Sequence, residues 1–266
     1  MIDIGVNLLH PQFDPDRTAV VDRARAAGVT GMLVTATDLT TAEAAIDLCA
    51  RTDLYCTAGV HPHEAKDAPA DLSERLLELA GNDRVRAIGE TGLDFHRSFS
   101  PHEIQRRLFD VQLEVASTCG LPVFVHDRDT GGAVFDELRP RAARLAGVVV
   151  HCFTGTSEDL ERYLDLGCFI GITGWVTEKR RGVELREVIR DLPLEKLLIE
   201  TDAPFLLPHN VPGGWREANA PGTRRRRNEP ALLPWVAAGV AEAMSVSVED
   251  VIRHSGDNAR RLFGLP

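Results

Sequence analysis

The sequence has no long hydrophobic run. Nowhere in its 266 residues does an apolar stretch approach the roughly 18 residues that cross a bilayer. The N-terminus, MIDIGVNLLHPQFD, also lacks the basic segment followed by an apolar stretch that marks a secretory signal. These absences argue against a membrane protein, and we expect a cytoplasmic protein that makes no membrane contact.

The cysteines do not occur in the sequence patterns that are typical of disulfide frameworks or zinc sites. The five cysteines form no C-x-x-C pair, and an odd number does not suit a disulfide framework. The sequence therefore predicts neither a disulfide-rich secreted fold nor a cysteine zinc site.

Positive charge is in the minority. The chain has 30 Lys and Arg against 40 Asp and Glu, and its formal net charge is −10. Proteins that coat nucleic acid non-specifically depend on many Lys and Arg contacts to phosphate, so the charge argues against that class. It is compatible with an enzyme that handles phosphate groups in one focused pocket.

Short apolar, β-branched runs alternate with segments of helical periodicity along most of the chain. This alternation predicts parallel strands, and eight such units fit a closed (β/α)8 TIM barrel of the α/β class. The predicted strands are residues 2–6, 32–36, 55–60, 85–88, 122–125, 147–150, 169–172 and 197–199. The predicted helices between them are residues 15–27, 41–51, 70–80, 101–119, 131–139, 157–166 and 182–191.

An open doubly wound sheet is the alternative fold. It predicts a glycine-rich phosphate loop after the first strand, but the chain reads VNLLHPQFD there, without G-x-G-x-x-G or a Walker sequence. From residue 230 onward the pattern is wholly helical, which predicts a C-terminal helical extension packed beside the barrel. We expect residues 1–266 to form a single domain, because 44% apolar composition is enough for one large core.

Polar and ionisable residues stand at the carboxyl ends of five predicted strands. In a TIM barrel these ends meet at one mouth, where active sites are built. Histidines and carboxylates on rigid backbone form a mixed nitrogen and oxygen site that suits Zn²⁺, Mn²⁺ or, with more water ligands, Mg²⁺. The residues at these strand ends are His61, His63, Glu90, Asp94, His126, Asp127, Arg128, His151, Glu200 and Asp202.

A single histidine at a strand end is more often a hydrogen-bonded rim residue than a metal ligand. His126 and His151 differ because both end apolar runs in the same register, beside Glu90 and Asp202. Glu200 is expected to point away from its neighbour on the chain, so its share in the site depends on where the strand turns.

The motifs GVHPH, IGETGLD, VHDRD, HCFTG and ETDAP follow in this order along the chain. A chain with this series resembles the TatD family of metal-dependent nucleases, within the amidohydrolase superfamily, over residues 3–263. The resemblance implies that His61 and the RRRNEP segment face the substrate. The metal-binding residues it implies are Glu90, His126, His151 and Asp202, the last of which also serves as base.

One part of the family pattern is missing. Most relatives carry D-x-H-x-H at the end of the first strand, where both histidines bind a metal, but DIGVN places Gly5 and Asn7 there. Glycine offers no side-chain ligand, and an amide oxygen is a weak ligand compared with imidazole. We therefore expect a weakened first metal position and a preference for Mg²⁺, with Mn²⁺ or Zn²⁺ as alternatives. The motifs DIGVNL, GITGWV and RRNEP together resemble the TatD proteins described as 3′-5′ exonucleases of single-stranded DNA and RNA.

The predicted function is metal-dependent 3′-5′ hydrolysis of phosphodiester bonds in single-stranded DNA or RNA, in DNA repair, by a monomer. The predicted catalytic residues are Asp202, Glu90 and Glu200. The predicted substrate-binding residues are His61, His63, Asp94, Arg128, Arg227 and Glu229.

The run TRRRRNEP places four consecutive arginines, residues 224–227, after the last strand. Such a cluster is usually a solvated surface run, but its position near the rim favours phosphate contact, with Arg227 and Glu229 facing inward. Aromatic residues in nearby loops either stack on unpaired bases or pack at the rim. These are Trp175, Phe205 and Trp215.

Two other functions stay open at this stage. A metal and base of this kind also serve acyl centres, so hydrolysis of an ester such as a D-aminoacyl-tRNA is an alternative. The second is a non-catalytic nucleic-acid-binding protein that has lost its first metal site at Gly5 and Asn7. The intact set of histidines and acids at the other strand ends argues against that loss.

Overall fold

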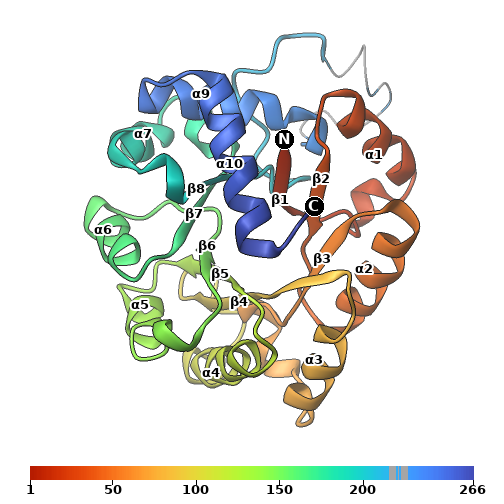
Figure 1. Cartoon of the computed structure of the whole chain (residues 1–266), viewed down its shortest axis with the longest axis vertical. Coiled ribbons are helices and arrows are strands. Elements are labelled where there is room, and N and C mark those ends of the chain that lie inside the picture. Colours follow the sequence, from red (N-terminus) through yellow and green to blue (C-terminus); the bar gives the residue numbers. More distant parts are fainter. Residues whose placement is uncertain (216–219, 221, 223–226) are drawn as a thin grey trace.

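The computed structural model describes residues 1–215, 220, 222 and 227–266. Eight parallel strands pair in sequence order and form a barrel with helices on its outside (Figure 1). The predicted TIM barrel is therefore confirmed. The strands are β1 (Ile2–Val6), β2 (Gly31–Val34), β3 (Tyr55–Ala58), β4 (Val85–Asp94), β5 (Val123–Arg128), β6 (Val148–Val150), β7 (Phe169–Ile172) and β8 (Leu197–Ile199).

The helices lie close to the ranges that periodicity predicts. The last predicted helix before β8 is shorter than expected, because it ends at Val188 and continues as a 3-10 turn, Ile189–Asp191. The helices are α1 (Arg17–Ala26), α2 (Leu39–Thr52), α3 (Leu72–Ala80), α4 (His102–Cys119), α5 (Ala133–Leu138), α6 (Ser157–Asp165), α7 (Gly182–Val188), α9 (Leu233–Met244) and α10 (Val248–Phe263).

Strands β4 and β5 run further than their apolar sequence predicts. The predicted strands end at residues 88 and 125, but strand pairing continues as far as Asp94 and Arg128. The register between the two strands shifts between Ile88 and Thr91, on either side of Glu90. The polar motifs therefore lie on hydrogen-bonded strands, which hold their side chains more rigidly than a loop would.

One end of the barrel is closed by α10. Its Asn258 side chain donates hydrogen bonds to the backbone oxygens of Leu194 and Leu197, at 2.7 and 2.8 Å, beside the start of β8. Figure 1 shows α10 crossing in front of the strands, at the same end as the two termini. The apolar side chains that fill this end are Ile2, Ile4, Leu33, Ala87, Phe124, Val149, Phe169 and Leu198 from the strands, with Ala259, Leu262, Phe263 and Leu265.

The barrel closes where the chain after β8 meets β1. The backbone N–H of Asp202 donates to Gly5 O at 2.9 Å, and the N–H of Asn7 donates to Ala203 O at 2.8 Å. A parallel bridge joins Val6 and Ala203. Residues that follow β8 are thereby fixed against the end of β1.

No single helix among the described residues has the length and apolar character needed to cross a membrane. Pro230–Met244 and Val248–Phe263 meet that test only as a pair, and they are bent by 110° at their junction. Both segments bury apolar side chains in the hydrophobic clusters of the protein.

A substitution at Gly59, which directly follows β3, tests how tightly β3 and β4 pack in the barrel. A Cβ added at Gly59 would lie 2.5 Å from the backbone of Gly89 in β4, so the two strands have no room for one. We expect Gly59→Ala to destabilise the protein by about 1–3 kcal/mol, as overpacked sites do, measured by urea unfolding. Gly213→Ala is the control, since nothing lies within 4 Å of its added Cβ. Equal stability of the two variants would contradict this packing.

Candidate active site

The carboxyl ends of the strands open into a cleft of about 610 Å³. The residues that line it follow every strand of the barrel, so the predicted convergence at one mouth is what the structure shows. Asp94 and Glu200 are fully buried and do not line this cleft. The predicted site residues that line it are His61, His63, Glu90, His126, Asp127, Arg128, His151 and Asp202.

Glu90 lies at the centre of this cluster. Its Oε1 is 2.7 Å from His151 Nε2 and 3.0 Å from His126 Nδ1. The same oxygen is 3.2 Å from His61 Nε2. Three imidazoles at the ends of β3, β5 and β6 therefore converge on one carboxylate of β4, although they are far apart in the sequence.

The GVHPH motif forms a turn that aims its two histidines differently. The Nδ1 of His61 accepts a hydrogen bond from the backbone N–H of His63 at 3.1 Å, which leaves Nε2 facing Glu90. His63 Nε2 is 2.6 Å from Asp94 Oδ2. Asp94 is in turn fixed by Gln105, whose side chain accepts from its N–H at 2.8 Å and donates to its carbonyl at 3.1 Å. His63 and Asp94 thus brace the cluster from one side.

Glu200 lies beneath the cluster. Its Oε1 accepts the backbone N–H of Cys152 at 2.6 Å, and its Oε2 is 3.4 Å from His151 Nδ1. A Cβ at Gly5 would lie 2.2 Å from Oε2, and one at Gly171 would lie 2.6 Å from Oε1. The carboxylate therefore uses the space that two glycines leave, and it contacts the far side of His151.

Asp202 reaches the cleft from a backbone turn after β8. Its φ of 52° is left-handed, which breaks the alternation of strand side chains that precedes it. Asn7 Nδ2 donates to Asp202 Oδ1 at 2.9 Å. Asn7 therefore orients the acid in this chain.

The charges of the cluster depend on one another. Burial would raise the pKa of Glu90, but the positive charge of His151, the nearby imidazole of His61 and hydrogen bonds from His126 and His151 hold it well below its usual range. Burial would lower the pKa of His151, but Glu90 and Glu200 raise it well above its usual value. The buried carboxylates of Glu90 and Glu200 therefore favour a positive charge on His151.

Asp202 is more weakly paired with positive charge than Glu90. Burial raises the pKa of Asp202 to about 7, although the charge of His151 opposes the shift. The carboxyl group is therefore close to the point where it exchanges a proton near neutral pH.

A divalent cation fits this set of donors. One ligand atom each from His61, Glu90 and His126 lie within 4.8 Å of one another. His126 Nε2 is buried without a hydrogen-bond partner within the described part of the chain. Imidazole nitrogens and carboxylate oxygens are ligands that suit Zn²⁺, Mn²⁺ and Mg²⁺.

The cleft also contains residues that sequence reasoning left out. Arg97, Arg181 and Thr154 line it in addition to the exposed Arg128. The aromatic residues Trp175 and Phe205 line it too, whereas Trp215 does not. The signal for Arg97 and Arg181 was weak, because each is one arginine among many in loops that follow a strand.

A family model described as TatD related DNase matches residues 2–264 of the chain. The chain belongs to this family. It is 46% identical over 267 residues to "3′-5′ ssDNA/RNA exonuclease TatD" of Pantoea ananatis, with 100% of both chains covered. It is 45% identical to the protein of the same description from Escherichia fergusonii, covering 100% of this chain and 99% of that one.

Solved structures of other proteins share the fold. A TatD homologue from Escherichia coli has a TM-score of 0.89 at 30% identity, covering 100% of this chain and 98% of that one. An uncharacterized amidohydrolase from Saccharomyces cerevisiae has a TM-score of 0.83 at 23% identity, covering 98% and 99%. The TatD resemblance that the motifs suggested is confirmed.

The sequence predicts that Arg227 and Glu229 face the cleft, but in the structure of this TatD family member they do not line it. Arg227 donates to Asp16 at 2.7 and 2.8 Å and to Glu229, and Arg23 Nε donates to Glu229 Oε2 at 2.7 Å. The side chains of Arg227 and Glu229 are 3% and 2% exposed. The two residues instead join the chain before α9 to α1, because buried charges require partners of opposite sign. The other arginines of the run, from Arg224 onward, lie outside the described residues.

Arg227→Ala tests this reassignment. Removal of the guanidinium leaves buried Glu229 with less positive charge, so we expect a loss of about 3–5 kcal/mol of unfolding free energy in urea. Arg75→Ala is the matched control. Arg75 pairs with Glu43 on the surface, where both are about half exposed, so its loss should cost roughly 0–1 kcal/mol. Unchanged stability together with weaker substrate binding would instead support the original prediction for Arg227.

Proposed function

We propose that this TatD family member is a metal-dependent 3′-5′ exonuclease that hydrolyses phosphodiester bonds of single-stranded DNA and RNA. The observation that carries the proposal is the convergence of His61, His126 and His151 on Glu90 inside the cleft, with Asp202 beside them. The full-length identity to relatives described as 3′-5′ ssDNA/RNA exonucleases supports the choice of substrate.

Glu90, His126, His151 and Asp202 are the residues proposed to hold the metal, and His61 stands close enough to join them. A divalent cation held there supplies Lewis-acid polarisation of the phosphate and neutralises charge as the phosphodiester bond breaks. Mg²⁺ is the proposed ion, with Mn²⁺ or Zn²⁺ as alternatives, because Gly5 and Asn7 remove two imidazole ligands from the family pattern.

Asp202 is the proposed general base. Its Oδ1 is held by Asn7, and its pKa of about 7 leaves a substantial ionised fraction at neutral pH to take a proton from the attacking water. Glu200 is buried below the cleft, so we propose that it acts through His151 instead of touching the substrate. It keeps that imidazole oriented, with Nε2 toward Glu90.

The arginines at the rim are the proposed phosphate contacts. Arg97, Arg128 and Arg181 line the cleft in a chain whose formal net charge is −10, so they concentrate positive charge where the substrate enters. His63 contributes to the same rim, whereas Asp94 positions it from below. The proposal also includes four points about the whole protein: the chain forms one domain, acts as a monomer, is located in the cytoplasm and takes part in DNA repair.

The direct test uses a single-stranded oligonucleotide labelled at its 5′ end. Stepwise shortening from the 3′ end in Mg²⁺, and none in EDTA, is the expected result. We expect Glu90→Gln and Asp202→Asn each to lower kcat/KM at least about a hundredfold, because metal polarisation and base catalysis each supply a share of that order. Glu195→Gln, an exposed acid before β8, is the control and should retain activity. Metal-independent cleavage, or full activity of Glu90→Gln, would refute the assignment.

Metal binding should depend on pH. Asp202 has a raised pKa of about 7, so its protonated fraction grows as pH falls, and protons must leave the cluster when a cation binds. We expect Mg²⁺ affinity, measured by calorimetry in buffers of different ionisation enthalpy, to be weaker at pH 6 than at pH 8, with proton release on binding. Asp202→Asn should release fewer protons. Equal affinity and no proton release across this range would contradict the proposed role of Asp202.

A further inference from the structure

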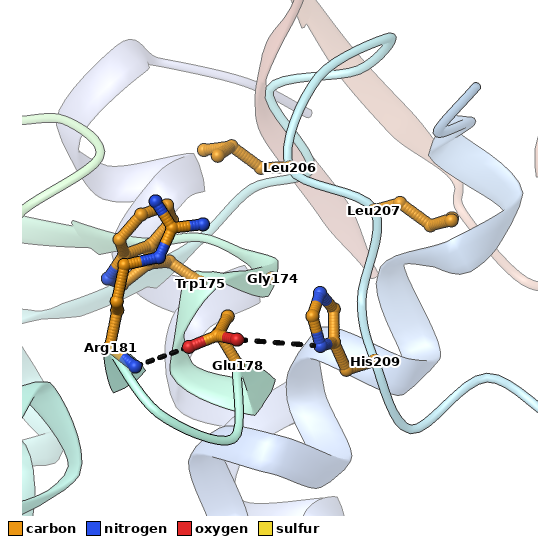
Figure 2. Close-up of a pocket in the computed structure, with 7 residues that line it drawn as sticks. All are labelled: Gly174, Trp175, Glu178, Arg181, Leu206, Leu207 and His209. Carbon is orange, nitrogen blue, oxygen red and sulfur yellow. Dashed lines mark hydrogen bonds and ion pairs between the residues drawn. The ribbon is translucent and has the colours of Figure 1, made fainter. Parts of the chain in front are cut away.

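A second cavity of about 450 Å³ opens beside the cleft (Figure 2). Trp175, Arg181 and Leu206 line both cavities, so the two are separated by a shared wall and not by the body of the barrel. Its volume falls within the roughly 300–1,000 Å³ of small-molecule sites. The roles assigned to the cleft leave this side cavity without a function.

The shared wall offers a flat, positively charged surface. The guanidinium carbon of Arg181 lies 4.4 Å from the centroid of the Trp175 ring, so the indole supports the guanidinium. Arg181 is an exposed residue, and Leu206 and Leu207 lie across the cavity from Glu178 (Figure 2). Guanidinium planes and aromatic rings are surfaces on which unpaired bases stack.

The opposite part of the cavity carries an oriented carboxylate. Glu178 Oε2 accepts the backbone N–H groups of Arg180, at 2.8 Å, and Arg181. These bonds lower the pKa of Glu178, so the group is ionised near neutral pH. Its Oε1 has only His209 Nδ1 nearby within the described residues, at 4.0 Å, and both side chains face the cavity in Figure 2. One oxygen of a fixed carboxylate is thus free to accept hydrogen bonds.

We propose that this side cavity binds the base of a nucleotide next to the scissile phosphate and that Glu178 makes it selective for guanine. The inference rests on the proposed action on single-stranded nucleic acid. The base stacks on the Arg181 plane while its Watson–Crick edge faces the carboxylate, which can only accept hydrogen bonds.

The chemistry of the four bases sets the order of preference. Guanine presents two neighbouring donors, N1–H and the N2 amino group, and both can approach the free Oε1 of Glu178. Adenine and cytosine each present one amino donor beside a ring nitrogen that is an acceptor. Thymine and uracil present one N–H between two carbonyl oxygens, which the negative charge of Glu178 repels. The site therefore ranks guanine first and thymine or uracil last.

The experiment compares single-stranded oligonucleotides that differ only in the 3′-terminal or the penultimate base. At one of these positions we expect kcat/KM of the wild-type protein to be roughly tenfold higher for guanine than for thymine, the size of one good base contact. Glu178→Gln, whose amide both donates and accepts, should reduce that ratio to about twofold or less. Arg181→Lys keeps the charge for phosphate contact but loses the plane on which the base stacks, so it should lower the ratio of kcat/KM between guanine and thymine as well. Glu195→Gln should keep the wild-type ratio.

Failure of this inference differs from failure of the proposed function. Metal-dependent cleavage with no base preference, or with a preference that survives Glu178→Gln, would overturn the inference alone. Absence of any cleavage would overturn the proposed function. In that case equilibrium binding of the same fluorescent oligonucleotides in EDTA decides the inference, because the roughly tenfold ratio should then appear in Kd. Equal Kd values would overturn it.

Discussion

The buried carboxylate of Glu90 is the constraint on which the site depends. A negative charge that is 6% exposed requires positive partners, and no lysine or arginine side chain forms an ion pair with it among the described residues. The imidazoles of His126 and His151, from two different strand ends, supply that charge, because the acids around them raise the pKa of each. Burial lowers the pKa of His61 to about 4, so His61 faces Glu90 as a neutral imidazole near neutral pH. The parallel barrel meets this requirement because it brings all its strand ends to one rim, and the closure of β1 against the chain after β8 adds Asp202 to the same group.

Position 5 shows how the members of the site depend on one another. The glycine there looks like a lost ligand when the sequence is compared with the family pattern. In the structure, Gly5 and Gly171 together leave space for the carboxylate of Glu200. That carboxylate lies against His151. A larger side chain at either glycine would displace Glu200, so the change at the end of β1 and the orientation of His151 are linked. Asn7 completes the change by holding Asp202.

Much of the fold and part of the site could be predicted from the sequence. The order of strands and helices follows from periodicity, and His126 and His151 could be located because each directly follows an apolar strand. Arg227 was misplaced because a run of arginines does not show which acids lie opposite; its partner Asp16 stands 211 positions earlier. Arg181 was overlooked because its stacking on Trp175, which lies in the nearby 3-10 helix Gly174–Thr177, follows neither the helical nor the strand period. Periodicity locates residues on strands but carries no information on how loops pair.

The closure of the barrel by α10 gives the enzyme a front and a back. Both chain ends lie at the closed end, where the N-terminal amine donates to Gly28 O at 2.9 Å and Pro266 O accepts from Arg260 at 3.0 Å (Figure 1). Substrate therefore enters, and products leave, at the open end of the barrel only. Either terminus can therefore be joined to a fused protein, an affinity tag or a solid support at the closed end, without blocking the open end of the barrel.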